Sequence, residues 1–171
     1  MFSVYEDKGE LERILLEIKV KAEKTFVQVS NRNFFRKLDP DSNSVAIILQ
    51  HLMESNVFRC DYLLAPNGQK PLRNRDAGFD VPPGRQKVVR ESLMKTWDRA
   101  WGKLFETLKS LTADDFSSKK FKFGDKEYST SGALELLYRH IVEHVGQFIL
   151  LAKHFAGKRW KTVSVPKTKK K

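Results

Sequence analysis

Apolar residues recur at intervals of three and four in four long stretches of the chain, and charged residues fill the positions between them. Such spacing places the apolar side chains on one face of an α-helix. It predicts helices over approximately residues 8–29, 44–65, 85–111 and 130–156. The third stretch carries its apolar residues at heptad-like spacing and includes Trp97 and Trp101. We interpret these two tryptophans as core residues and not as a binding site.

The connections between these stretches differ in kind. Residues 39–43 form an Asp-Pro-Asp-Ser-Asn turn, after which Asn43 or Ser44 can cap the second helix. Residues 66–84 contain four prolines and three glycines, so neither a helix nor a strand is expected to persist there. Extended, that segment spans about 60 Å, enough to pass along a whole helix. Residues 119–130 alternate aromatic residues about a Gly-Asp turn, which predicts a short β-hairpin.

Four amphipathic helices joined by long connections predict an all-α protein, a four-helix bundle with a crossover loop and a small β-hairpin before the last helix. A chain of 171 residues suits one domain, and no internal repeat is visible. We therefore expect a bundle domain over residues 1–157, followed by a basic C-terminal tail over residues 158–171.

The charge is distributed unevenly along the chain. The formal net charge is +11, but residues 158–171 hold seven basic and no acidic residues, which leaves +4 for residues 1–157. Most of the excess therefore belongs to the tail. This distribution argues against specific nucleic-acid binding by the folded domain.

The lengths of the apolar runs and the cysteine content exclude further classes of protein. No stretch approaches the roughly 18 apolar residues of a membrane-spanning helix, and the N-terminus lacks the layout of a secretory signal. We therefore expect a soluble, cytoplasmic protein without membrane contact. The single cysteine, Cys60, excludes an internal disulfide. It lies nine residues after His51, on the opposite side of the helix, so we expect it to be an inert packing residue.

Three histidines fall on the inward faces of the predicted helices. His140 and His144 are four residues apart, so their side chains lie about 5–6 Å apart on one face, a span that one metal ion can bridge. His51 points inward from the second helix at a similar depth. An imidazole buried without a partner costs about 1–3 kcal/mol, so these rings are either hydrogen-bonded core histidines or metal ligands. His154 lies about 15 Å farther along the axis and cannot join them.

Two polar residues flank the HxxxH pair. Gln147 lies one turn after His144 and is expected to face inward, where it can orient a ligand water, bond an imidazole N–H or make an ordinary core hydrogen bond. Glu143 points about 60° away from His140, and it is either an acceptor or base near the metal or a surface charge. Ile141 occupies the position where an HExxH metalloprotease has its glutamate, so that class is excluded.

The long crossover loop is a second candidate for function. Loops of this length inside a compact domain are commonly functional. Arg73, Arg75 and Asp76 are its candidates, either for gating or for a network of Arg-Asp bonds that holds the loop down. The sequence leaves both interpretations open.

Four segments together resemble the DinB/YfiT-like superfamily, which includes metal-dependent enzymes. They are NSVAIILQHLMESNVFR, KPLRNRDAGF, RHIVEHVGQFILLAKH and RWKTVSVPK, and they span nearly the whole chain. The resemblance implies an up-down-down-up four-helix bundle, a bound divalent metal and frequently a homodimer. The family's pattern of one histidine in the second helix and HxxxH in the last falls on His51, His140 and His144. One turn after the first histidine, where close relatives often have asparagine, this chain has Ser55 followed by Asn56.

The resemblance implies a metal-dependent transferase or hydrolase that acts on a small molecule, and some members of the superfamily use a low-molecular-weight thiol. Three neutral imidazoles leave a zinc-like ion at least one open position, as in catalytic sites, where water or a thiolate is activated. An all-imidazole site suits Zn, Ni, Co, Cu or Fe, of which we expect Zn or Ni. The alternative is a non-catalytic protein, either a metal-stabilised interaction module or a basic nucleic-acid-associated one.

Overall fold

The computed structural model describes residues 7–81 and 84–165, and it is mainly helical. In these ranges the α-helices are α1 (Lys8–Phe26), α2 (Asn31–Phe34), α3 (Val45–Leu64), α4 (Gln86–Ser110), α5 (Ala113–Ser118) and α6 (Thr130–Ala156). Single 3-10 turns are η1 (Pro66–Gly68), η2 (Asp76–Phe79) and η3 (Gly157–Arg159). The strands β1 (Lys120–Phe123) and β2 (Lys126–Ser129) pair as an antiparallel hairpin, as the sequence predicts.

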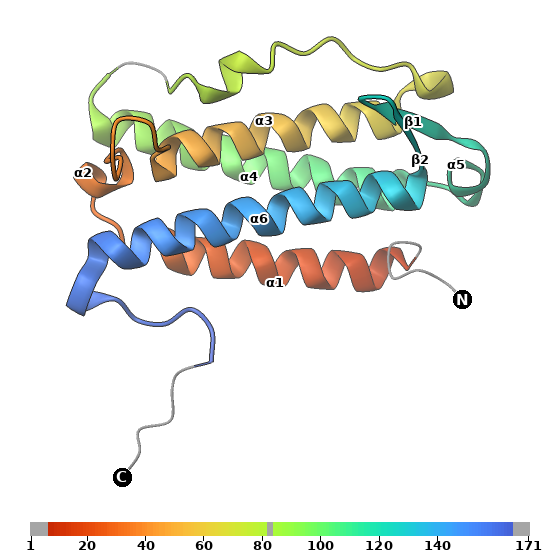
Figure 1. The fold of residues 1–171 in the computed structure, drawn as a ribbon. Helices are drawn as coiled ribbons and strands as arrows, with labels where there is room; N and C mark the ends of the chain where they lie inside the picture. Colours follow the sequence, from red (N-terminus) through yellow and green to blue (C-terminus); the bar gives the residue numbers. More distant parts are fainter. Residues whose placement is uncertain (1–6, 82–83, 166–171) are drawn as a thin grey trace.

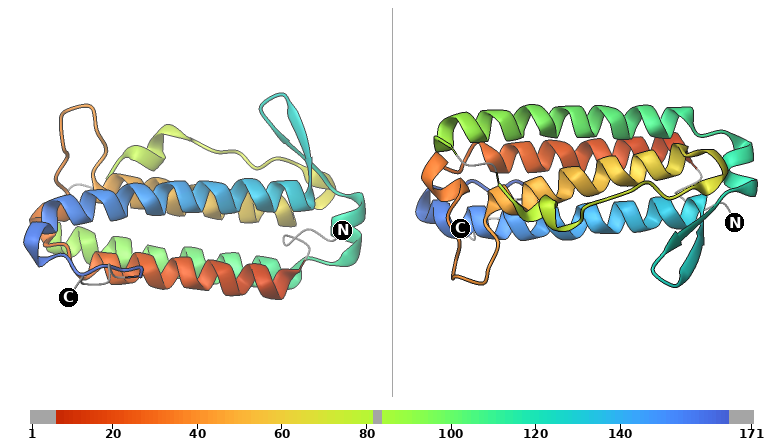
Figure 2. Two further views of the ribbon diagram at one scale, coloured as in Figure 1. Left: turned by 60° about the horizontal axis from the view of Figure 1, so that its bottom comes forward. Right: turned by 90° about the horizontal axis from the view of Figure 1, so that it is seen from above.

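The four long helices lie side by side with nearly parallel axes (Figures 1 and 2). Helix α3 packs against α4 and α6, and α1 completes the arrangement by packing against α6 and α4. The segment between α3 and α4 runs along the outside of α3 (Figure 1), as expected from its length. Among the described helices, none has the length and apolar character needed to cross a membrane.

Aromatic side chains fill the space between the long helices. Trp97 and Trp101 of α4 are buried, and their rings meet edge to face with centroids 5.3 Å apart. Trp97 also contacts Phe26 of α1 at 5.3 Å, and Phe26 contacts Phe148 of α6 at 5.0 Å. These contacts join three helices, so the two tryptophans are core residues, as predicted.

Polar caps and a glycine fix the ends of the helices that carry the histidines. Ser44 caps α3 by accepting a hydrogen bond from the Ile47 N–H at 3.3 Å, and Ser129 caps α6 by accepting one from the Gly132 N–H at 3.2 Å. Helix α6 ends at Gly157, whose φ of 55° suits a residue without a Cβ. The bounds of α3, α4 and α6 fall within one residue of the prediction, whereas α1 ends three residues before residue 29.

The apolar pattern does not predict α2 and α5. Helix α2 has four residues and α5 has six, too few for a period of 3.6 to be visible. The expectation that residues 66–84 contain no helix is wrong for the single turns η1 and η2. Single 3-10 turns tolerate the proline and glycine that would break a longer helix. Residues 82–83 of this segment, and residues 166–171 of the predicted tail, lie outside the described residues.

Arg90 of α4 fastens the end of α1 to the rest of the structure. Its Nη1 donates to the Val29 carbonyl at 2.7 Å and to Asn31 Oδ1 at 3.0 Å, and its Nη2 donates to the Phe26 carbonyl at 2.6 Å. The guanidinium also lies 4.7 Å from the centroid of the Phe34 ring. One side chain therefore joins α4, the end of α1 and α2.

We expect Arg90→Ala to lower the free energy of unfolding by about 2–3 kcal/mol, because the carbonyl groups lose a charged donor. Arg99→Ala is the control, since Arg99 lies on the exposed side of α4 and bonds Thr96. Its effect should stay within about 0.5 kcal/mol. Urea denaturation followed by circular dichroism measures both variants. Equal losses in the two variants would contradict a fastening role for Arg90.

Candidate metal centre

Three histidine side chains from α3 and α6 meet between these helices. The Nε2 of His140 lies 3.2 Å from the Nε2 of His51 and 3.2 Å from the Nε2 of His144. Each ring offers one nitrogen within 4.8 Å of those of the other two. The structure therefore brings together the three histidines that the sequence singles out, and the group could hold a metal ion.

The spacing of the nitrogens suits a tetrahedral metal site. Imidazole nitrogens that bind zinc at about 2.0–2.1 Å in tetrahedral geometry are separated from one another by about 3.3 Å. The separations of 3.2 Å around His140 match that value. The donor set is also appropriate, because imidazole is a good ligand for several divalent transition metals.

Hydrogen bonds among the rings do not satisfy all three histidines. Gln147 Oε1 lies 2.7 Å from Nδ1 of His144, and an amide oxygen accepts but does not donate. Neutral His144 therefore carries its proton on Nδ1 and presents a lone pair at Nε2. A proton on His140 Nε2 cannot point at both of its neighbours, so no tautomer gives well-aligned bonds at both 3.2 Å contacts.

The outer nitrogens of two of the rings are also without partners. Nδ1 of His51 and Nδ1 of His140 are buried and have no hydrogen-bond partner among the described residues. Burial without a partner is unfavourable for a polar ring. A cation bound at the three Nε2 atoms would use the lone pairs that face one another, so the residues present fit a metal ion.

Burial keeps two of the three histidines in the neutral form that can bind a metal. Burial lowers the pKa of His51 to about 4 and that of His140 to about 3. The neighbouring positive charges of Arg59 and Arg73 depress both pKa values further. His51 and His140 are therefore neutral at neutral pH, which is the form that binds a metal.

The crossover segment covers His51 through two residues that the sequence does not single out. The Phe79 ring of η2 stacks on the His51 ring, with centroids 4.3 Å apart and planes 25° apart. Gly78 is buried beside it, and a Cβ there would lie 2.8 Å from Glu54 Oε2 and 3.6 Å from His51 Nδ1. A larger residue at this position would make the Glu54 side chain shift. In the sequence, the DAGF end of the KPLRNRDAGF segment is the feature that could have indicated this contact.

Gln147 lies differently from the expectation, whereas Glu143 has the exposure of a surface charge, one of its two interpretations. Gln147 does bond His144, but its side chain is exposed and does not face the core. The reason is that His140 and His144 are themselves only partly buried, so their face of α6 borders solvent one turn later. Glu143 is exposed and makes no hydrogen bond or ion pair with the described residues. Its role near a metal stays a prediction.

The expected network of arginine and aspartate in the crossover is absent from the described residues. Neither Arg73 nor Arg75 pairs with Asp76, and no other ion pair involves these three side chains. Arg73 instead lies with its guanidinium carbon 5.2 Å from the centroid of the Phe58 ring. The loop is therefore held to α3 by contacts of this kind and by the Phe79 stack.

Two residues that we excluded from the site lie apart from it. Cys60 is fully buried, and burial raises the pKa of its thiol to about 11, which suits a packing residue. His154 is exposed and contacts the Phe155 ring, with centroids 5.1 Å apart. Ser55 is buried one turn after His51, and its Oγ accepts a hydrogen bond from Arg59 Nε at 3.5 Å.

Comparisons with known proteins place the chain in a family. No curated protein and no solved structure matches it. A family model described as a protein of unknown function (DUF1572) matches residues 9–169, which include His51, His140 and His144. That description names neither a DinB-like fold nor an activity. Because the match covers nearly the whole sequence, the chain belongs to the DUF1572 family.

Proposed function

We propose that the protein is a metal-dependent enzyme of the DinB-like type, in which His51, His140 and His144 bind one divalent ion. The observation that carries the proposal is the convergence of three Nε2 atoms at separations that suit a tetrahedral ion. No set of tautomers gives these atoms well-aligned hydrogen bonds at both contacts of His140. The fold we propose for it is the up-down-down-up four-helix bundle. Support comes from the long crossover, which lets α3 and α4 run in the same direction (Figure 1).

Three imidazoles occupy three positions of a tetrahedral ion and leave at least one for a small molecule. Zn²⁺ or Ni²⁺ would supply Lewis-acid activation of water or of a low-molecular-weight thiol, so the reaction class is hydrolysis or group transfer. Gln147 holds His144 in the tautomer whose Nε2 lone pair is free. Phe79 fixes the ring plane of His51 and keeps water from that face. The homodimer that the family resemblance implies stays a prediction.

The first prediction concerns metal binding. We expect metal-free, tag-free protein to bind one Zn²⁺ or Ni²⁺ per chain and His140→Ala to lose this binding, because Nε2 of His140 contacts both other rings. His154→Ala should bind as the unchanged protein does. Isothermal titration calorimetry measures all three. Full binding by His140→Ala, or none by the unchanged protein, would contradict the assignment.

The second prediction concerns the tautomer of His144. Gln147→Leu should weaken zinc binding about tenfold, because His144 loses the acceptor that holds its proton on Nδ1. Gln147→Glu keeps an acceptor and should keep the affinity. Gln50→Leu is the control, since Gln50 bonds Glu54 on α3 and not a histidine. Competition with a chromogenic chelator gives the affinities. Equal losses in both Gln147 variants would show that the hydrogen bond is not the cause.

The third prediction concerns catalysis. Metal-loaded protein should hydrolyse an activated ester such as 4-nitrophenyl acetate, or transfer a low-molecular-weight thiol to 1-chloro-2,4-dinitrobenzene. Removal of the metal with a chelator, or His144→Ala, should reduce the rate to that of the buffer, because either change destroys the three-histidine set. Absorbance assays follow both reactions. If zinc raises the melting temperature but neither reaction occurs, the non-catalytic, metal-stabilised alternative replaces the enzyme.

A further inference from the structure

A pocket of about 430 Å³, whose lining begins less than two turns after His51 on α3, is lined by positively charged side chains. It lies between α3, the crossover segment and the turn of the β-hairpin. Its charged residues are Arg59 of α3 and Lys70, Arg73 and Arg75 of the crossover, and none of its described lining residues is acidic. The rest of the lining is Phe58, Pro71, Phe123 and Gly124.

The positive charge of this pocket is not neutralised within the described part of the chain. No carboxylate there forms an ion pair with any of the four cations. The charge of Glu54 raises the pKa of Arg73 and so offsets part of the positive charge, but Glu54 forms no ion pair with it. Burial and the charge of Arg73 both lower the pKa of Arg59. An anion would supply the opposite charge that this site lacks.

Two of the guanidinium groups also carry buried nitrogens without a hydrogen-bond acceptor. Arg59 Nη1 and both Nε and Nη2 of Arg73 are buried and without partners among the described residues. The guanidinium carbons lie 5.1 Å from the Phe123 ring centroid for Arg59 and 5.2 Å from the Phe58 ring centroid for Arg73. These stacks hold the guanidinium groups at the pocket, although buried donors without acceptors are unfavourable.

Both segments that line the pocket, α3 and the crossover, also carry a residue of the histidine region. Arg59 follows His51 by two turns of α3, and Arg73 and Arg75 precede the η2 turn that places Phe79 on His51. No histidine is among the described residues that line the pocket, so a molecule held by the arginines would have to extend beyond it, along α3, to reach the histidine cluster. The same crossover segment would hold its charged end and cover His51.

We propose that this pocket binds the doubly charged oxyanion of a small-molecule substrate, a phosphate or a dicarboxylate, whose other end reacts at the histidine cluster. The inference rests on the proposed function. The planar fork of an arginine matches two oxygens of a carboxylate or phosphate, and two arginines with two further cations suit a double charge. The volume of about 430 Å³ lies within the usual range for small-molecule sites.

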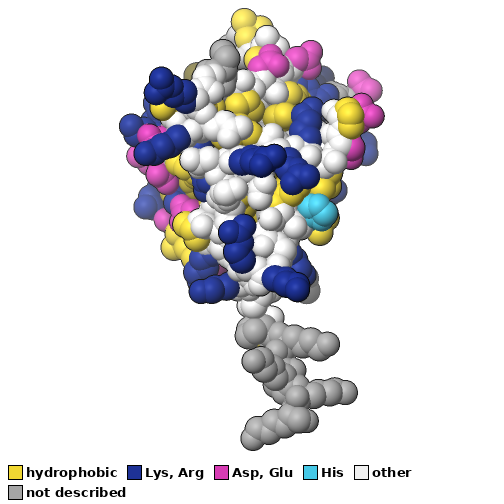
Figure 3. All heavy atoms as spheres, turned by 90° about the vertical axis from the view of Figure 1, so that its left-hand side faces the viewer, with side chains coloured by type: hydrophobic (Ala, Val, Ile, Leu, Met, Phe, Trp, Pro, Cys, Tyr) yellow, Lys and Arg dark blue, Asp and Glu magenta, His cyan; other side chains and the backbone are white. Residues whose placement is uncertain are grey.

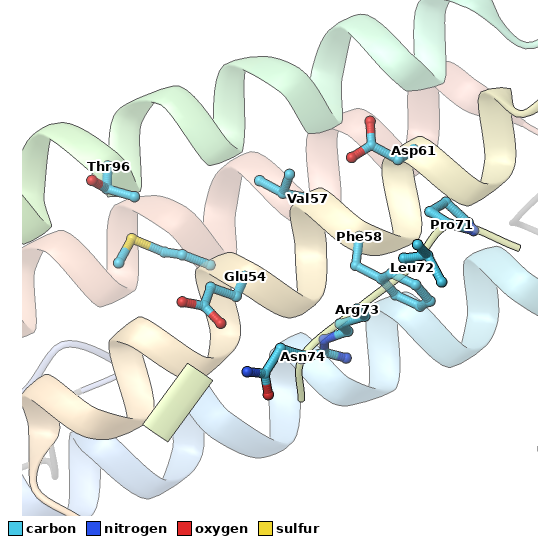
Figure 4. Close-up of a pocket in the computed structure, with 10 residues that line it drawn as sticks. Glu54, Val57, Phe58, Asp61, Pro71, Leu72, Arg73, Asn74 and Thr96 are labelled. Carbon is cyan, nitrogen blue, oxygen red and sulfur yellow. The ribbon is translucent and has the colours of Figure 1, made fainter. Parts of the chain in front are cut away.

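The neighbouring pocket of about 340 Å³ does not suit the anion. It lies on the other side of Arg73, between α3, α4 and the crossover, and Figure 4 shows the carboxylates of Glu54 and Asp61 among its lining residues. Asp61 is paired with Lys103, but Glu54 forms no ion pair in the described part of the chain and would repel an anion. Phe58, Pro71 and Arg73 line both pockets, so the crossover separates an acidic from a basic cavity.

A nucleic-acid backbone is the other polyanion to consider. Lys and Arg side chains spread over the end of the molecule that carries α2 (Figure 3). The basic pocket lies toward the opposite end, beside the β-hairpin (Figure 1). A strand held at that end would have to extend along the molecule to reach the pocket, whereas a small anion fits within its volume of about 430 Å³.

The test measures anion binding and zinc binding in the same variants. Inorganic phosphate and succinate are titrated calorimetrically into metal-free and zinc-loaded protein. We expect saturable binding of one or both anions to each form and at least about tenfold weaker binding to Arg59→Gln and Arg73→Gln. Arg99→Gln, which removes one positive charge from the exposed side of α4, should bind the anions as the unchanged protein does. Zinc affinity should not fall in any of the variants, because removing a positive charge does not weaken the binding of a cation.

A folding control and a nucleic-acid competitor complete the design. Circular dichroism checks the folding of each variant. If Arg73→Gln unfolds, Arg73→Lys replaces it; this variant keeps the charge but loses the planar guanidinium, so it should bind the anions with intermediate affinity. Absence of binding by both anions, or equal binding in the arginine and control variants, would overturn the inference. So would a 12-nucleotide single strand that binds more tightly than either anion and depends on the same arginines.

These measurements distinguish a failure of the proposed metal centre from a failure of the proposed anion pocket. Zinc binding without arginine-dependent anion binding would leave the metal centre in place and overturn the basic pocket. Anion binding that depends on Arg59 and Arg73 in a chain that binds no zinc would support the pocket and overturn the proposed function.

Discussion

The contact of His140 with both His51 and His144 is the constraint on which the account depends. Three neutral rings cannot all be satisfied by one another when Gln147 already fixes the proton of His144. A single cation removes the conflict, because each ring then directs a lone pair at a positive charge. Burial supports this arrangement, since it keeps His51 and His140 in the neutral form that a cation needs.

The long helices and the crossover have different parts in building this region. Helices α3 and α6 are capped at their first turns and packed along their length, so they hold the histidines at fixed depths. The crossover adds what the helices lack, because it stacks Phe79 on His51 and brings Arg73 and Arg75 beside Arg59. A rigid pair of helices thus supplies the candidate ligands, and one loop supplies both the cover and the candidate anion pocket.

The sequence predicts those features that depend on local periodicity. The apolar spacing and the caps predict α3, α4 and α6. The HxxxH spacing, with the similar depth of His51 in its helix, predicts the contact between His51 and His140, which are 89 residues apart. Features that depend on tertiary placement were missed. The exposure of Gln147 depends on where α6 meets solvent, and the approach of Gly78 to His51 depends on the path of the loop. The arginine cluster is hidden because its members come from two segments.

Anomalous diffraction from a crystal grown with one equivalent of zinc tests the central claim most directly. The account predicts one strong anomalous peak per chain, at about 2.0–2.1 Å from the Nε2 atoms of His51, His140 and His144, with at least one further position open. A peak bound by fewer than three of these rings, or one located elsewhere on the chain, would contradict it.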